Sequence, residues 1–188
     1  RKTWCASSTH YNEEQICGNA HIKLKKKFKN LLTIIIPRHI DRSLAIEKEL
    51  SKANLKIHFD SSISKINPKT DIYIVDSYGK TKSFYNVCKH VFLGGSLIEH
   101  GGQNPLEATR YGCKVIHGPS VSNFTEIYQL LKKKKISIEI KNQKQMINAL
   151  SHFFSKNNNT KKSEKHLKFL GKQILIKTYK EINKVIKQ

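Results

Sequence analysis

Several short patterns that mark common enzyme classes are missing from this sequence of 188 residues. There is no Asp-x-Asp pair, the arrangement of carboxylates that suits a magnesium-bound diphosphate. There is also no Gly-x-Ser-x-Gly turn, which would present a hydrolase nucleophile, and no complete P-loop, which would cradle a nucleoside triphosphate. These absences argue against the commonest hydrolases, against nucleoside triphosphatases and against a metal-dependent diphosphate site.

Cysteine and long apolar runs are also scarce. The cysteines occur singly, without a Cys-x-x-Cys pair or a nearby histidine at metal-ligand spacing, at Cys5, Cys17, Cys88 and Cys113. We therefore expect reduced, mostly buried thiols and no metal site. No apolar run approaches the roughly 18 to 20 residues of a membrane-spanning helix, and no signal peptide is recognisable, so we expect a segment that is soluble or at most peripheral to a membrane. Because residue 1 is arginine and the only methionine is Met146, we expect that a further segment precedes residue 1.

Negative charge is scarce as well, with 14 Asp and Glu against 35 Lys and Arg and a formal net charge of +21. Lysine supplies nearly all of the positive charge, since the only arginines are Arg1, Arg38, Arg42 and Arg110. Lysine, asparagine and isoleucine share AT-rich codons, so genome composition explains much of this excess. Attraction to an anionic membrane surface is the next interpretation, and nucleic-acid binding is the last, because basic charge alone specifies no partner.

What the sequence does contain is a regular alternation of short apolar segments with amphipathic ones. The apolar segments predict strands at Thr3–Ser8, Leu31–Ile36, Lys56–Phe59, Asp71–Val75, Val91–Leu93, Lys114–His117 and Ile136–Ile140. The intervening segments predict helices from Asn12 to Phe28, Asp41 or Ser43 to Ala53, Gly79 onward, Pro105 to Gly112, Asn123 to Leu131 and Asn142 to Phe154. This order is typical of an α/β fold with a Rossmann-like, doubly wound parallel sheet.

We expect this sheet to occupy residues 1–155 as one domain. The run 156–162 is polar and reads as a linker. Residues 163–188 carry apolar side chains at helical spacing and predict a long C-terminal helix that packs back on the domain or on a missing partner.

Ligands of such sheets bind at the carboxyl ends of the strands, where this chain has three informative loops. The first loop contains Ser8, Thr9 and His10, the second Pro37, Arg38 and His39, and the third is the glycine-rich run from Gly94 to Glu107. Glycines allow close approach of an anion, and the start of the following helix attracts it. The third loop therefore predicts a phosphate site at Gly94, Gly95 and Ser96. We expect Asn104 to cap the following helix, and Glu107 to complete a capping box or to bind a ribose. A tight turn before a helix needs the same residues, so that interpretation stays open.

The polar side chains of the other two loops also have two interpretations. Arg38 follows a buried strand and could clamp a phosphate or carboxylate bidentately, or it could form an ion pair with Asp41 or Asp60. His10 and His39 could donate to an anion or exchange a proton. Ser8, Thr9 and Asn12 could instead cap the first helix.

A series of segments, taken in order, resembles one family. These are Ala6-Ser7-Ser8-Thr9-His10 with Glu13-Glu14, Ile36-Pro37-Arg38-His39, Gly94-Gly95-Ser96, His100-Gly101-Gly102-Gln103-Asn104-Pro105-Leu106-Glu107, and Gly118-Pro119 with Asn123-Phe124. Spanning about Trp4 to Ile127, they resemble the C-terminal half of the 3-deoxy-D-manno-octulosonic acid (Kdo) transferases, which move Kdo from CMP-Kdo onto lipid A precursor.

This resemblance implies a metal-independent GT-B glycosyltransferase without a cofactor, of which this chain is the donor-binding C-terminal domain. It implies that Pro37 and Arg38 contact the CMP, that Tyr78 and Gly79 line the nucleotide, and that Asn104 and Glu107 hold phosphate and ribose. Arg38 would stabilise the leaving group. The general base would be a glutamate of an N-terminal domain outside this chain, so we expect the isolated chain to be inactive. The full set of expected donor contacts is Ser8, Thr9, His10, Pro37, Arg38, His39, Tyr78, Gly79, Gly94, Gly95, Ser96, Asn104 and Glu107.

The same resemblance implies a lipid A precursor as acceptor and residence at the cytoplasmic face of the bacterial inner membrane, through the N-terminal half, with no nucleic-acid partner. The chain departs from the family at Asn12, usually glycine, at Gln103, usually histidine, and at Tyr78-Gly79-Lys80-Thr81, where Met-Gly-Glu-Leu is usual. Lys80 thus reverses a charge near the expected nucleotide. A non-catalytic nucleotide-sugar module, a GT-B enzyme that uses a UDP-sugar, and a sugar epimerase remain the alternatives.

Overall fold

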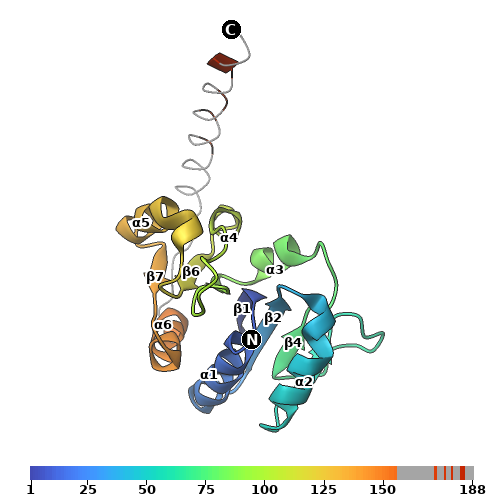
Figure 1. The fold of residues 1–188 in the computed structure, drawn as a ribbon. Helices are drawn as coiled ribbons and strands as arrows, with labels where there is room; N and C mark the ends of the chain where they lie inside the picture. The colour runs from blue at the N-terminus through green and yellow to red at the C-terminus, as the bar shows by residue number, and fades with distance from the viewer. Residues whose placement is uncertain (156–171, 173–175, 177–178, 180–182, 185–188) are drawn as a thin grey trace.

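The computed structural model describes residues 1–155 together with residues 172, 176, 179, 183 and 184. Its centre is a parallel sheet of seven strands in the order β3-β4-β2-β1-β5-β6-β7 (Figure 1). The strands are β1 Lys2–Thr9, β2 Leu31–Pro37, β3 Ile57–Phe59, β4 Ile72–Ile74, β5 His90–Leu93, β6 Lys114–His117 and β7 Ser137–Glu139. The predicted α/β class with a doubly wound parallel sheet is confirmed.

The central strands owe their position to apolar residues on both faces. All seven residues of β2 are buried, as expected for a strand covered on both sides. In β1, Trp4 and Ala6 point into one hydrophobic cluster while Cys5 points into another, because successive side chains of a strand alternate between faces. Two separate cores therefore lie on opposite sides of the sheet.

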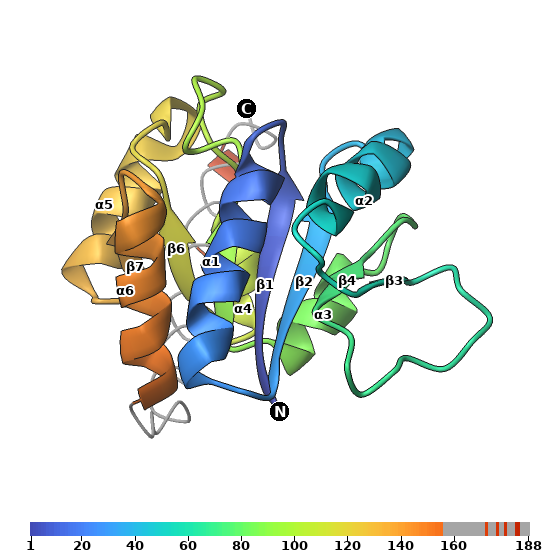
Figure 2. The same cartoon turned by 90° about the horizontal axis from the view of Figure 1, so that it is seen from below.

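Three helices cover each face. Helices α1 (Glu13–Lys27), α2 (Ser43–Ser51) and α6 (Gln143–Ser155) contribute to the core that contains Trp4. Helices α3 (Thr81–Val87), α4 (Leu106–Arg110) and α5 (Thr125–Lys133) contribute Tyr85, Ala108 and Tyr128 to the core that contains Cys5. Figure 2 shows α1, α2 and α6 together on the near side of the sheet. Two short 3-10 helices, Ile40–Arg42 and Ser122–Phe124, precede α2 and α5.

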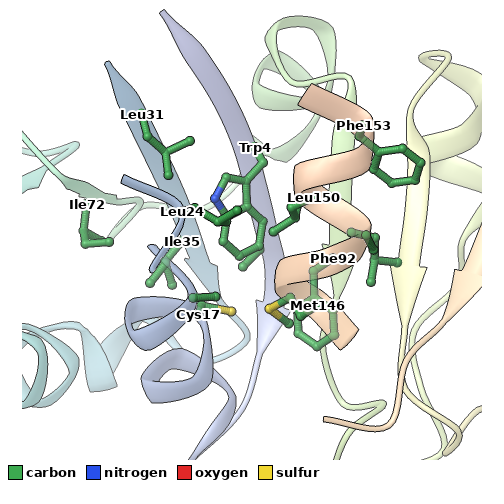
Figure 3. Close-up of a cluster of buried hydrophobic side chains, with 14 of the residues drawn as sticks. Trp4, Cys17, Leu24, Leu31, Ile35, Ile72, Phe92, Met146, Leu150 and Phe153 are labelled. Atoms are coloured by element: carbon green, nitrogen blue, oxygen red, sulfur yellow. The ribbon is translucent and has the colours of Figure 1, made fainter. Parts of the chain in front are cut away.

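The first core is built around Trp4, which has no exposed surface. Figure 3 shows Trp4 between side chains of α1, such as Leu24, and side chains of α6, such as Leu150 and Met146. Helices α1 and α6 thus pack side by side across the centre of the sheet, although about 120 residues separate them in sequence. This packing fixes the start of α1, and with it the loop that joins β1 to α1.

The strands that follow β1 in sequence lie first on one side of it and then on the other. On one side are β2, β4 and β3, with β3 at the edge of the sheet, and on the other side are β5, β6 and β7. The loops after the adjacent strands β1 and β5 lead to helices on opposite faces of the sheet, so the carboxyl ends of these two strands form a topological switch point. This switch point is where a ligand of a doubly wound fold binds.

Most predicted elements agree with the structure, with differences at the helix ends. Asn142, where the last of these helices was predicted to begin, caps α6, since its Oδ1 accepts the Gln145 N–H at 3.0 Å. Asn12 and Asn123, where two other helices were predicted to begin, form no side-chain hydrogen bond at the helix start, so the cap considered for Asn12 does not form. The predicted linker 156–162 lies outside the described residues. So does most of the predicted helix 163–188, of which the described positions are helical.

Helices long and apolar enough to cross a bilayer are absent from the described part of the chain.

All four cysteines are buried, as expected.

Candidate donor site

The candidate site begins at the carboxyl end of β1, where the strand is irregular. Its register with β2 shifts between Ser7 and Thr9, and Ser8 has a φ of 54°, a left-handed conformation that is uncommon for serine. Such a bulge bends the strand and redirects the residues that follow it, in this case Thr9 and His10. Backbone strain of this kind is concentrated at functional sites.

The loop after β5 packs against this bulge, backbone against backbone. The Gly94 N–H donates to the Ser7 carbonyl at 2.9 Å, and a Cβ on Gly94 would lie 2.3 Å from the Ser8 carbonyl oxygen and 2.6 Å from the Thr9 Cα. No side chain fits there. Gly94 is therefore required for the contact between the two loops, and the ligand contact expected of it stays a prediction.

The anion held by the glycine loop is an internal one. Glu13, the first residue of α1, has no exposed surface. Its Oε2 accepts the Gly95 N–H at 2.7 Å and the His10 N–H at 3.0 Å, while its Oε1 accepts the N–H groups of Ser96 at 3.1 Å and Leu97 at 3.0 Å. The Gly95 and Ser96 amides, which were predicted to bind a ligand phosphate, thus bind Glu13 in this structure, and their contact with a ligand stays a prediction.

The Ser96 side chain is also fully engaged. Its hydroxyl donates to the Leu93 carbonyl at 2.5 Å and accepts the Gly118 N–H at 2.8 Å, and the residue is fully buried. It joins the ends of β5 and β6, which is a structural role, and the ligand contact expected of Ser96 stays a prediction. Thr9 and Pro37 are buried as well, and they contribute through the backbone: the Thr9 carbonyl accepts the Arg38 N–H at 2.9 Å.

Three histidines gather above the glycine loop. The His10 ring centroid lies 4.2 Å from that of His100 and 6.0 Å from that of His39. His10 is 9% exposed, and its Nε2 is buried without a hydrogen-bond partner. Burial, followed by His100, His39, Arg38 and Arg42, lowers the pKa of His10 from 6.5 to about 4. A buried ring nitrogen without a hydrogen-bond partner, near the guanidinium groups of Arg38 and Arg42, suits a polar or anionic ligand.

Arg38 follows the last residue of β2, at the same edge of the sheet. Its side chain is exposed, and no carboxylate among the described residues forms an ion pair with it. The ion pair with Asp60 that was considered as an alternative does not form, because Asp60 accepts from Lys80, Tyr73 and Ser77 instead. The guanidinium is therefore available to an anion from outside the chain.

Arg42 is a cation of this edge that sequence reasoning did not single out. Its guanidinium binds both carboxylate oxygens of Glu14, at 3.0 and 3.4 Å, and its Cζ lies 5.7 Å from the centre of the Tyr11 ring. Glu14 is buried, which raises its pKa even though Arg42 acts in the opposite direction. The adjacent acids Glu13 and Glu14 thus have separate tasks, one on the glycine loop and one on Arg42.

The loop after β4 contributes the residues expected beside the nucleotide. Tyr78 is 75% exposed, and Gly79 has a φ of +81°, with open space where a side chain would begin, since a Cβ there would meet nothing within 4 Å. Lys80 stands where the family usually has glutamate, and its Nζ lies 2.5 Å from Asp60 Oδ2. Its charge is therefore paired within the domain, which reduces its influence on a neighbouring ligand.

Helix α4 is shorter than the sequence suggested. It extends over Leu106–Arg110, little more than one turn, so its dipole is small and contributes less to anion binding than expected. Asn104 does cap this segment, with its Oδ1 accepting the Leu106 N–H at 2.9 Å. Glu107 is exposed, and its carboxylate lies 3.9 Å from the Lys82 Nζ of α3, so α3 and α4 meet here.

The structure thus sorts the predicted residues into two groups. His10, Arg38 and His39 lie just beyond the ends of β1 and β2, where His10 Nε2 has no hydrogen-bond partner and Arg38 and His39 are exposed. Tyr78, Gly79, Asn104 and Glu107 are exposed on the segments that follow β4 and β5. Thr9, Pro37, Gly94, Gly95 and Ser96 are buried and shape the site from within, and the half-buried Ser8 forms the bulge.

Comparisons with known proteins agree with this arrangement. No protein-family model matches the chain. The chain is 32% identical over 176 residues to a 3-deoxy-D-manno-octulosonic acid transferase of Haemophilus influenzae, with 94% of this chain and 40% of that protein covered. It is 30% identical over 166 residues to the enzyme of the same name from Aquifex aeolicus, with 88% of this chain and 46% of that protein covered. The chain therefore spans less than half of either relative.

The structural comparison identifies the domain. The C-terminal CMP-Kdo binding domain of WaaA from Acinetobacter baumannii superimposes with a TM-score of 0.82 and 26% identity, covering 89% of this chain and 87% of that one. The fold is that of the C-terminal domain of a GT-B glycosyltransferase. By sequence and by structure, this chain is a relative of the C-terminal domain of the 3-deoxy-D-manno-octulosonic acid transferases.

Proposed function

We propose that this chain is the donor-binding half of a Kdo transferase, which binds CMP-Kdo and supports transfer of Kdo from it. One observation carries the proposal: the unpaired guanidinium of Arg38 and the buried, unpartnered Nε2 of His10 lie at the end of β2 and β1, beside the switch point of the sheet. The similarity to a domain described as CMP-Kdo binding supports the same ligand.

The charges of the site suit this donor. CMP-Kdo carries one negative charge on its phosphodiester and another on the carboxylate of Kdo. Arg38 offers a planar fork of N–H donors that matches either group, and His39 lies exposed beside it. Since the first amides of the glycine loop are occupied by Glu13, the donor charge is taken up by these side chains.

The chemistry of transfer gives Arg38 a defined role. When the bond between the anomeric carbon of Kdo and the phosphate oxygen breaks, the electron pair remains on CMP and its phosphate gains a second negative charge. A fixed cation beside this oxygen stabilises the transition state more than the ground state. The new bond joins the anomeric carbon to an acceptor oxygen, whose proton goes to a base outside this chain.

The exposed residues after β4 and β5 complete the donor site in this proposal. Asn104 and Glu107 would hold phosphate and ribose, and Tyr78 and Gly79 would line the nucleotide, because all four residues are exposed at the same edge of the sheet. Glu107 keeps an exposed carboxylate with only a distant lysine as partner, so it can accept from ribose hydroxyls.

The remaining parts of the proposal concern the acceptor and the location. We propose lipid A precursor as acceptor and the cytoplasmic face of the bacterial inner membrane as location. The formal charge of +21 supports attraction to an anionic lipid surface. Acceptor contacts and the general base would come from the half of the enzyme that this chain does not span, so we expect the isolated chain to bind donor without turning it over.

Titration of the 188-residue chain with CMP, UMP and a duplex oligonucleotide tests the donor assignment. We expect saturable CMP binding that is stronger than UMP binding and is weakened by Arg38→Ala. Glu47→Gln, a change of charge on α2 whose described partner is only Ser51, serves as the control. Equal affinity for UMP would favour the alternative of a GT-B enzyme that uses a UDP-sugar, and tight duplex binding without CMP binding would refute the proposal.

A non-catalytic nucleotide-sugar module is the second candidate, and Lys80 is the observation that favours it. The pairing of Lys80 with Asp60 weakens this candidate, because it removes the free charge that would disturb the nucleotide. Joining the chain to the N-terminal half of a related transferase and measuring CMP release from CMP-Kdo separates the two. Release supports the enzyme, whereas CMP binding without release supports the module.

A further inference from the structure

The carboxylate of Glu13 and the glycine loop depend on each other. Within the described residues, no lysine, arginine or histidine forms an ion pair with Glu13, so backbone N–H groups alone compensate its buried charge. An ionised carboxylate only accepts hydrogen bonds, and each oxygen of Glu13 accepts two of these N–H groups. Removing the charge would leave several buried donors without an acceptor.

The loop in turn has a conformation that calls for an anion. Gly95 has a φ of +65°, and the N–H groups of Gly95, Ser96 and Leu97 all point to the carboxylate of Glu13. Successive N–H groups in such a turn form a concave anion site. In many phosphate-binding proteins the ligand fills this concavity, but here a side chain of the same domain fills it.

The loop also forms the surface beneath the histidines. A Cβ placed on Gly95 would lie 3.0 Å from His100 Cδ2 and 3.3 Å from the unpartnered His10 Nε2. Glu13 additionally accepts the backbone N–H of His10. One carboxylate therefore fixes both the loop and the histidine that faces it.

We propose, on the basis of the proposed function, that Glu13 is a positioning residue of the donor site. It acts as a built-in anion that holds the glycine loop and His10 in place and leaves the donor charge to the cationic side chains. Glu13 touches no substrate in this arrangement. Its effect on donor binding passes through Gly95 and His10.

The first test combines amide hydrogen exchange with CMP titration of the 188-residue chain. In Glu13→Gln, which keeps the shape but replaces an acceptor oxygen by an NH2 group, we expect exchange at Gly95, Ser96 and Leu97 to accelerate about tenfold or more, and CMP affinity to fall by a similar factor. Exchange in β2 should not change. The control Glu47→Gln should leave both measurements unaltered, and circular dichroism verifies the fold of each variant.

The second test is chemical rescue. Glu13→Ala vacates the site of the carboxylate, so added formate should occupy it, slow the exchange of the loop amides and restore CMP affinity. Formate should not rescue Glu13→Gln, in which the amide still fills the space. A role confined to general stability would not respond to formate in this selective way. If Glu13→Ala does not fold, the comparison of Glu13→Gln with the wild type decides.

The outcomes separate the two proposals. Unchanged CMP affinity or unchanged loop exchange in Glu13→Gln would overturn the positioning role and leave the proposed function intact. Absence of CMP binding by the wild-type chain would overturn the proposed function and, with it, any role of Glu13 in donor binding.

Discussion

The two edges of the sheet use charge in opposite ways. At the amino edge, Asp71 is 3% exposed and accepts from His21 Nε2 at 3.2 Å, from Lys25 and from the Lys56 N–H at 3.0 Å. Its charge is fully matched inside the domain. At the carboxyl edge, Arg38 has no carboxylate partner among the described residues, and His10 Nε2 has no hydrogen-bond partner.

This contrast separates stability from function. A buried charge with several partners contributes to the stability of the fold, and its loss is costly because the partners are left unmatched. A group kept without a partner costs stability, and such groups are concentrated at binding sites. Variants at the amino edge should therefore lose stability, whereas variants at the carboxyl edge should lose donor binding or turnover.

The largest expected effect is on catalysis, from Arg38→Ala. In a complete transferase that contains this chain, the variant should lower turnover by about 100-fold or more, because it removes a fixed cation from the leaving phosphate. Its melting temperature should match the wild type, since no carboxylate among the described residues pairs with the guanidinium. CMP release gives the rate and calorimetry gives the stability. Near-normal turnover would refute the contrast between the edges.

Asp71→Asn should show the reverse pattern. It weakens the hydrogen bonds from His21 and Lys25 and should lower the free energy of unfolding by about 2 kcal/mol. CMP affinity should be unchanged, since Asp71 lies at the opposite edge of the sheet. Urea unfolding and CMP titration measure the two quantities, with Glu47→Gln as the control. A loss of CMP affinity without a loss of stability would mean that the edges are not independent.

The pH dependence of stability involves one histidine from each edge. Burial is the main cause that lowers the pKa of both His10 and His90 to about 4, from 6.5. The unfolded chain therefore binds more protons than the folded one between pH 6.5 and 4, so stability should decline as the pH falls through this window. His90→Phe, which preserves the stacking with Phe153, should flatten part of the decline, as measured by urea unfolding at several pH values. An unaltered slope would contradict this assignment.

The smallest effect is expected from Lys80→Ala. The Lys80 side chain is 49% exposed, so its ion pair with Asp60 should contribute less than about 1 kcal/mol to stability. CMP affinity should change little, because that pairing already neutralises the lysine. A large gain in CMP affinity would instead show that Lys80 opposes the nucleotide, and it would support a weakened donor site.

The sequence predicted the fold well because the relevant signals are local. The apolar run of β2 and the alternation in β1 are visible within single segments, and the rule that parallel strands bind ligands at their carboxyl ends then brings His10, Arg38 and the glycine loop to one edge. The length of α4 was not predictable in this way, because its end depends on how Cys113 and Gly112 turn back into β6.

The contacts that define the site are not local, and sequence reasoning missed them. Glu13 and Gly95 are 82 residues apart, and Arg42 and Glu14 are 28 apart. A pair of acids at the start of a helix indicates by itself only a favourable interaction with the helix dipole. Only the bulge at Ser8 and the folding of α1 against α6 direct Glu13 toward the other loop.

The backbone contact between Gly94 and Ser8 has one more consequence. The absence of a side chain at Gly94 lets the two loops touch through their backbones, and the hydrogen bond from the Gly94 N–H to the Ser7 carbonyl joins them directly. A ligand that displaces one of these loops is therefore expected to displace the other.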